Sequence, residues 1–141
     1  MSARTKARKR ALDLIYGADL RGVPLATLLA EEQVRADADP RRAGSWDYAR
    51  RIVEGVAEHG AEIDAAILEH AHGWTLDRMP VLDRAIARLA AWELLYNDEV
   101  PDAVAISEAV ESATLLSTED SAGYLNGLLA GIARAAHPAG S

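Results

Sequence analysis

Cysteine is absent from the 141 residues of this chain. Since thiolates form disulfides, catalyse thiol chemistry and ligate most structural zinc ions, the absence excludes all three. It also agrees with a reducing compartment, so we expect the chain to work in the cytoplasm. Stability must then come from an apolar core.

Phenylalanine is also absent, and aromatic residues make up only 5% of the chain, although 50% of it is hydrophobic. A chain of this length and composition can build one core, which predicts a single domain. Leu, Ile, Val and Ala should fill that core through close approach of helices. We expect Trp46, Trp74 and Trp92 to be its local anchors.

Long hydrophobic runs are missing as well. Asp13 and Asp19 interrupt the apolar stretch behind the basic start, which argues against a secretory signal. The longest weakly polar stretch, residues 121–133, falls short of the ~20 residues needed to cross a bilayer. We therefore expect no membrane partner.

Acidic residues outnumber basic ones, 22 to 15, but the charges are unevenly distributed. Residues 1–10 contain five basic residues and no acid, so the rest of the chain carries 10 basic and 22 acidic residues, a formal charge of 10 − 22 = −12. A cationic pole on an anionic body favours a polyanionic partner. Short basic starts also occur as solubilising tails, so composition alone leaves both interpretations open.

The basic start has a helical pattern. Apolar residues from 7 to 18 share one face, while Lys6, Lys9 and Arg10 lie on the far side, and Lys9 is nearly in line with Tyr16. A cationic stripe that leads to an aromatic ring is typical of a single-stranded nucleic-acid surface, because phosphates pair with the charges and a base stacks on the ring.

Apolar residues are spaced three or four apart throughout, which predicts an all-α fold. The expected helices are 5–20, 24–33, 48–56, 80–97, one from 101 to the turn at 117–121, and a last one to 136, with a polar loop at 37–44. Gly60 interrupts the pattern after 48–56, and residues 63–70 resume it as a fourth helix or as a kinked continuation. We expect 80–97 to be the longest, with Arg78, Arg84 and Arg88 on its outer side. Gly123, Gly127 and Gly131 recur every four residues, each costing up to ~1 kcal/mol of helix propensity, which predicts that another backbone packs there.

Four segments resemble the NusB family of transcription antitermination factors. Residues 104–113 read VAISEAVESA, residues 119–129 read EDSAGYLNGLL, residues 7–16 read ARKRALDLIY, and residues 82–94 read LDRAIARLAAWEL. They are similar to the family's VAINEAVELAK and S-x-x-F-[VI]-N-G-[VI]-L signatures, its basic R-x-x-A-x-x-x-L-Y opening and its central helix. The match covers essentially the whole chain in the family's order.

The resemblance implies an all-α RNA-binding domain over residues 1–141, with about six or seven helices in two packed sub-bundles. It implies that the chain, with a small-subunit ribosomal protein (NusE), binds the boxA element of ribosomal RNA leaders. Together with other Nus factors and RNA polymerase, such a complex suppresses premature termination. Some relatives pair with themselves, so a homodimer remains open.

The resemblance also implies roles for individual residues. The RNA-binding residues it implies are Arg4, Lys6, Arg8, Lys9, Arg10 and Tyr124. Tyr16 and Asp83 match positions that face the ribosomal partner, and an outward acidic Asp83 would suit a basic protein.

This chain departs from the family pattern where basic residues are common. Thr114 stands in place of a lysine, and Ala122 and Gly123 stand where a basic residue often precedes the aromatic position. Two phosphate contacts are therefore missing, which shifts the expected RNA affinity to residues 4–10. The net negative charge of the rest of the chain would repel RNA, so we expect the chain to need a basic partner.

Other kinds of site find little support. His59, His70 and His72 do not converge on one helix face, so we expect no metal site. Acidic pairs lie at polar helix ends, and no glycine-rich phosphate loop follows a strand, so we expect no cofactor and no enzymatic activity.

Two alternative functions stay open. NusB-like modules also occur fused to RNA cytosine methyltransferases, where they help hold ribosomal RNA. That alternative predicts a downstream catalytic domain, whereas residues 137–141 are expected to form a loose tail. The other alternative is a helical protein–protein adaptor that never contacts RNA.

Overall fold

The computed structural model describes residues 2–138, which form seven α-helices and no strand. The helices are α1 (Ala3–Arg21), α2 (Leu25–Ala38), α3 (Trp46–Glu58), α4 (Gly60–Glu69), α5 (Val81–Tyr96), α6 (Asp102–Leu116) and α7 (Glu119–Ala136). Short 3-10 turns occur at Pro40–Arg42 and Leu76–Arg78. The prediction of an all-α single domain is confirmed.

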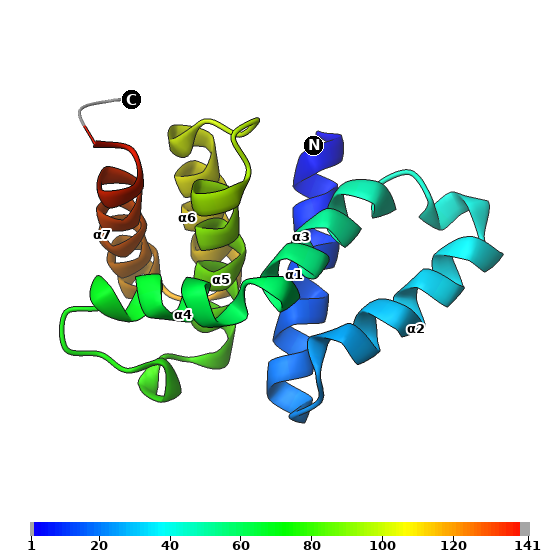
Figure 1. Cartoon of the computed structure of the whole chain (residues 1–141), viewed down its shortest axis with the longest axis horizontal. Helices are drawn as coiled ribbons and strands as arrows, with labels where there is room; N and C mark the ends of the chain where they lie inside the picture. Colours follow the sequence, from blue (N-terminus) through cyan, green and yellow to red (C-terminus); the bar gives the residue numbers. More distant parts are fainter. Residues whose placement is uncertain (1, 139–141) are drawn as a thin grey trace.

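The helices form two groups around α5, as Figure 1 shows: α1, α2 and α3 lie on one side, and α6 and α7 on the other. Helix α5 packs against α1, α3, α4, α6 and α7. The expected two sub-bundles are therefore present, and α5 joins them.

Polar caps and special residues set the helix ends. The Ser2 side chain accepts a hydrogen bond from the Thr5 N–H at 3.0 Å and so caps α1. Gly22 ends the same helix with φ of 68°, a left-handed conformation that glycine adopts at low cost. Prolines precede α2, α5 and α6, as the sequence predicted.

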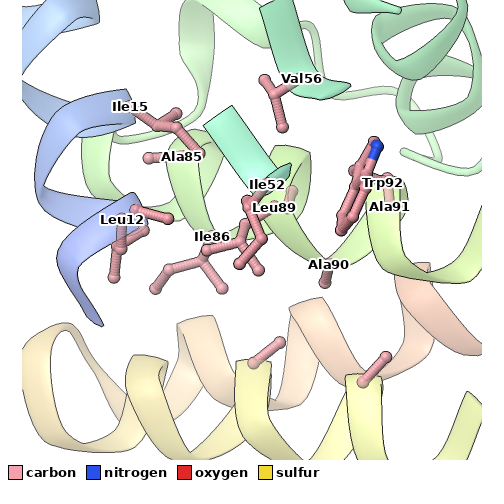
Figure 2. Close-up of a cluster of buried hydrophobic side chains, with 14 of the residues drawn as sticks. Leu12, Ile15, Ile52, Val56, Ala85, Ile86, Leu89, Ala90, Ala91 and Trp92 are labelled. Carbon is pink, nitrogen blue, oxygen red and sulfur yellow. The ribbon is translucent and has the colours of Figure 1, made fainter. Parts of the chain in front are cut away.

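Aliphatic side chains fill the core where α1, α3 and α5 meet. Figure 2 shows Leu12 and Ile15 from α1 near Ile52 from α3 and Ile86 from α5. Of the three expected tryptophan anchors, Trp46 and Trp92 are buried, but Trp74 is 49% exposed. Trp74 lies in the loop before α5, where the apolar helix faces do not cover it.

Glycine allows α3 and α5 to approach closely at one point. A Cβ atom built on Gly55 would lie 1.9 Å from Nε1 of the buried Trp92. The indole therefore occupies the space that any side chain at position 55 would need.

The glycine stripe of α7 does not receive another backbone, contrary to the prediction. A Cβ on Gly123 or Gly127 would meet nothing within 4 Å, and one on Gly131 would meet the side chain of His70 at 2.7 Å. Only Gly131 therefore has a packing reason to lack a side chain.

Three further predictions about the helices were wrong. The longest helix is α1 with 19 residues, whereas α5 has 16. Helix α2 continues to Ala38, into the expected polar loop. Arg84 and Arg88 are not on an outer face: Arg84 Nε lies 2.6 Å from Asp19 Oδ2, and Arg88 Nε lies 2.8 Å from Asp64 Oδ1. These ion pairs fasten α5 to α1 and α4.

The carboxy-terminal end is partly anchored. His137 Nδ1 lies 2.9 Å from Asp102 Oδ2, so His137 does not belong to a loose tail, and residues 139–141 lie outside the described part of the chain. No helix within 2–138 has the length and hydropathy of a membrane span.

Candidate nucleic-acid interface

The basic residues of α1 differ sharply in exposure. Lys6 and Lys9 are exposed, Arg4 and Arg10 are partly buried, and Arg8 is buried. Helical geometry explains the difference, because Arg8 is one turn before the buried Leu12 and therefore shares its inward face. The five cations do not form one free surface.

Arg8 holds α1 to the central helix. Its Nε lies 3.1 and 3.0 Å from the two carboxylate oxygens of Glu93, which is 1% exposed, and its Nη1 lies 3.4 Å from Glu108. Tyr48 donates a further hydrogen bond to Glu93, and Asn97 donates one to the Tyr48 hydroxyl. Burial and the Glu93 carboxylate raise the pKa of Tyr48 well above its usual value. Arg8 thus neutralises a buried carboxylate, and we remove it from the expected RNA surface.

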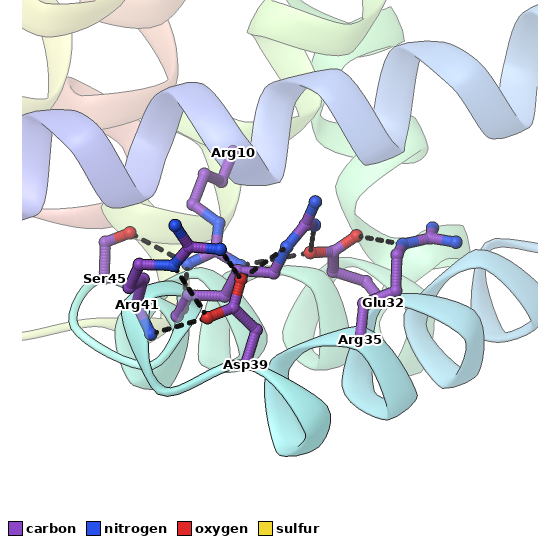
Figure 3. A network of polar contacts seen from close by, with 7 residues as sticks. Arg10, Glu32, Arg35, Asp39, Arg41 and Ser45 are labelled. Atoms are coloured by element: carbon purple, nitrogen blue, oxygen red, sulfur yellow. Dashed lines mark hydrogen bonds and ion pairs between the residues drawn. The ribbon is translucent and has the colours of Figure 1, made fainter.

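Arg10 is committed to the α2–α3 corner, shown in Figure 3. It donates hydrogen bonds to the Ser45 hydroxyl at 2.9 Å and to Glu32 at 3.1 Å, and its guanidinium lies 5.1 Å from the Trp46 ring centre. Glu32 also accepts from Arg35 and Arg42. Partial burial acts to raise the pKa of Glu32, but these arginines hold it below its usual value. The charge of Arg10 is therefore partly compensated.

Arg4 also contacts a carboxylate, that of Glu99 at 3.2 Å, and its guanidinium lies 4.6 Å from the centre of the Tyr48 ring. Lys6 and Lys9 differ from all three arginines, because neither has an ion-pair partner within the described residues. Among the five cations of residues 4–10, the ones without an ion-pair partner are thus Lys6 and Lys9, although the charge of Lys9 also acts on Asp13 one turn further along α1. We therefore expect weaker RNA binding than five free cations would give.

Asp83 is not an outward residue of α5, contrary to the expectation. It is 4% exposed and accepts hydrogen bonds from the Ser117 hydroxyl at 2.8 Å and from the Ser121 hydroxyl at 2.6 Å. The carboxylate thereby fixes the turn between α6 and α7 to the first turn of α5. Tyr16, by contrast, is half-buried at the edge of the core.

Tyr124 lies far from the start of α1. Its hydroxyl donates to the Ala71 carbonyl at 2.9 Å, which ties it to the loop between α4 and α5. Figure 1 places that loop at the lower end of the molecule and the start of α1 at the upper end. The predicted RNA residues therefore form two separate regions.

Sequence reasoning missed the aromatic partner of Tyr124. The exposed Trp74 ring lies 5.9 Å from the Tyr124 ring at an angle of 50°, and both rings line a surface pocket together with Met79 and Asp120. Burial raises the pKa of Tyr124. The pair offers aromatic surface for stacking, whereas Asp120 would repel a phosphate there. The sequence did contain one signal for this aromatic pair, because Trp74 lies outside all the expected helices.

Two of the three histidines weighed as metal ligands have packing contacts, and His72 is exposed. His59 stacks on Tyr96 with ring centres 3.9 Å apart, and His70 packs against Gly131. In the described range, no group of three or more His, Asp or Glu side chains is placed to hold a metal ion.

Comparison with known proteins gives a consistent result. The model of the NusB family matches residues 5–134. The transcription antitermination protein NusB of Leifsonia xyli subsp. xyli is 63% identical over 95% of this chain and 93% of its own length. The protein of the same name from Clavibacter sepedonicus is 58% identical over 96% of this chain and 98% of its own length.

Solved structures agree with the sequence matches. NusB from T. maritima superposes with a TM-score of 0.80 and 32% identity, covering 93% of this chain and 90% of that one. A chain from the crystal structure of the antitermination factors NusB and NusE in complex with double-stranded RNA gives a TM-score of 0.80 at 27% identity, over 96% of this chain and 98% of that one. The chain therefore belongs to the NusB family of transcription antitermination proteins.

Proposed function

We propose that this chain is a cytoplasmic transcription antitermination factor that acts by assembly. With the ribosomal protein NusE it binds boxA-type leader RNA of ribosomal RNA operons. The assembled complex, with other Nus factors, helps RNA polymerase read through terminators. The observation that carries the proposal is the match over 96% of the chain to a NusB that was crystallised with NusE and RNA.

The charge distribution supports a shared RNA surface. Lys6 and Lys9 provide point charges for phosphates, while the formal net charge of −7 on the whole chain repels RNA elsewhere. Two phosphate contacts correspond to a log–log salt slope of about −1.4, using ~0.7 per phosphate for a single strand. The chain alone should bind weakly, and a basic partner would extend the cationic surface.

Replacing both lysines tests the RNA surface. We expect Lys6→Gln/Lys9→Gln to weaken binding of boxA-type RNA roughly tenfold at low salt and to reduce the salt slope by about 1.4, because two phosphate contacts are lost. Fluorescence anisotropy of labelled RNA, with and without NusE, measures both quantities.

The matched control is Arg21→Gln/Arg78→Gln, which removes two exposed charges away from the start of α1. It should leave the affinity within about twofold. Equal losses in the two double variants would contradict the lysine surface. Wild-type protein that ignores RNA both with and without NusE would favour the adaptor function instead.

Tyr16 remains a proposed contact for NusE, whereas the burial of Asp83 leaves it no direct contact to make. We expect Tyr16→Ala to weaken NusE binding roughly tenfold, since interface aromatics commonly dominate binding energy. Titration calorimetry measures the affinity. The control is Tyr96→Ala, which removes another partly exposed tyrosine, and equal affinity for NusE in wild type and Tyr16→Ala would refute the contact.

A further inference from the structure

We propose that Arg4 of α1 and Arg51 of α3 form a binding site for a backbone phosphate of RNA, which the carboxylate of Glu99 occupies in the free protein. This inference rests on the proposed function and names where a phosphate binds on this chain. It adds Arg51 and Glu99, which lie outside the basic start, to the RNA surface.

One oxygen atom of Glu99 joins the two arginines. Its Oε2 lies 3.2 Å from Arg4 Nη2 and 3.3 Å from Arg51 Nη1. All three side chains reach solvent, with exposed fractions of 41% for Arg4, 49% for Arg51 and 62% for Glu99. The hydrogen bonds from Arg51 and then Arg4 lower the pKa of Glu99, which is therefore a carboxylate at neutral pH.

The ring of Tyr48 holds the two guanidinium groups in place. Arg4 lies 4.6 Å and Arg51 5.6 Å from its centre, distances at which cations are attracted to an aromatic face. Tyr48 itself is fixed by its hydrogen bonds with the buried Glu93 and Asn97. A rigid ring thus keeps two flexible cations together without help from Glu99.

Phosphate chemistry fits this arrangement. A phosphodiester carries one negative charge, as Glu99 does. A single oxygen of Glu99 contacts both arginines, whereas a phosphodiester has two free oxygens and can offer one to each arginine. Exposed ion pairs are weak, so Glu99 is easily displaced. The backbone N–H of Glu99 donates to Asn97, which keeps its loop in place while the side chain turns away.

RNA is the polyanion that the position favours. Lys6 and Lys9 follow Arg4 within two helical turns but project from α1 about 140–200° around the helix from it, so a strand that contacts all three must wrap around the start of α1. An RNA phosphate therefore competes with an internal carboxylate, and the removal of that carboxylate should strengthen binding.

The test is Glu99→Gln, measured by fluorescence anisotropy with two labelled probes, boxA-type RNA and a 12-nucleotide oligouridine. We expect three- to tenfold tighter binding of both, because the phosphate no longer displaces an anion. The matched control is Glu54→Gln, an exposed carboxylate on α3 that pairs with Arg50 at 3.5 Å. It should change affinity by less than twofold, and a gain equal to that of Glu99→Gln would overturn the site.

Arg51→Gln supplies the second arm. It should weaken binding three- to tenfold and reduce the salt slope by about 0.7, the value for one phosphate. In the Arg51→Gln background, the added Glu99→Gln substitution should raise RNA affinity less than twofold. If the affinity rose as much as in the wild-type background, the proposed competition at Arg51 would be refuted. Oligouridine lacks the boxA sequence, so its response tests the phosphate site even if boxA recognition with NusE fails. Unchanged oligouridine binding in Glu99→Gln would overturn the inference while leaving the proposed function standing.

Discussion

Arg8→Ala should lower the free energy of unfolding by about 3–5 kcal/mol. The substitution leaves Glu93, 1% exposed, as a buried charge without its cation, and it also deprives Glu108 of a partner. The loss is a large part of the 5–15 kcal/mol typical of a folded domain. Urea denaturation followed by circular dichroism measures it.

Two controls separate the buried ion pair from general effects on α1. Lys9→Ala, an exposed neighbour on the same helix, should change stability by no more than about 0.5 kcal/mol. Arg8→Met/Glu93→Gln, which removes both charges, should recover part of the loss. If Arg8→Ala had the same urea midpoint of unfolding as the wild type, the structural role assigned to Arg8 would be refuted.

Gly55→Ala should destabilise the protein by about 2–3 kcal/mol, although alanine is a better helix former by about 1 kcal/mol. The new methyl group would lie 1.9 Å from Nε1 and 2.4 Å from Cε2 of Trp92, and the buried indole cannot move without disturbing α3 and α5. Thermal unfolding and the tryptophan emission spectrum report the change.

Gly127→Ala is the matched control, because the same substitution in α7 meets nothing within 4 Å. It should raise stability by up to about 1 kcal/mol through helix propensity. Opposite signs at the two glycines are expected, and a stabilising Gly55→Ala would contradict the close approach of α3 and α5.

Local sequence rules predicted the helices well. Spacing of apolar residues, prolines before helices and Gly22 after α1 are short-range signals, and each appears at the expected place. The predicted end of α2 was wrong because Pro40 and Gly44 suggested a polar loop from residue 37, whereas the helix persists to Ala38. The family resemblance, which used the order of four segments, gave the function class.

Side-chain partners were the main failure, because they depend on contacts between distant residues. Arg8 pairs with Glu93, 85 positions away, and Asp83 with Ser117 and Ser121, 34 and 38 positions away. One clue was available: Glu93 stands in the apolar run of α5, and a buried carboxylate needs a cation. The sequence does not say which of the basic residues supplies it.

The double duty of α1 limits how its RNA affinity can be adjusted. Ser2 caps the helix, Arg8 neutralises a buried acid, Arg10 binds the α2–α3 corner, and Ala7 and Ala11 are buried, so five of the first eleven residues maintain the fold. Selection or engineering can alter Lys6 and Lys9 with little structural cost. Deleting the amino-terminal segment would remove fold-maintaining residues together with the lysines, so a loss of RNA binding could come from unfolding. Binding studies should therefore keep the start of the chain intact and carry the label at the carboxy terminus.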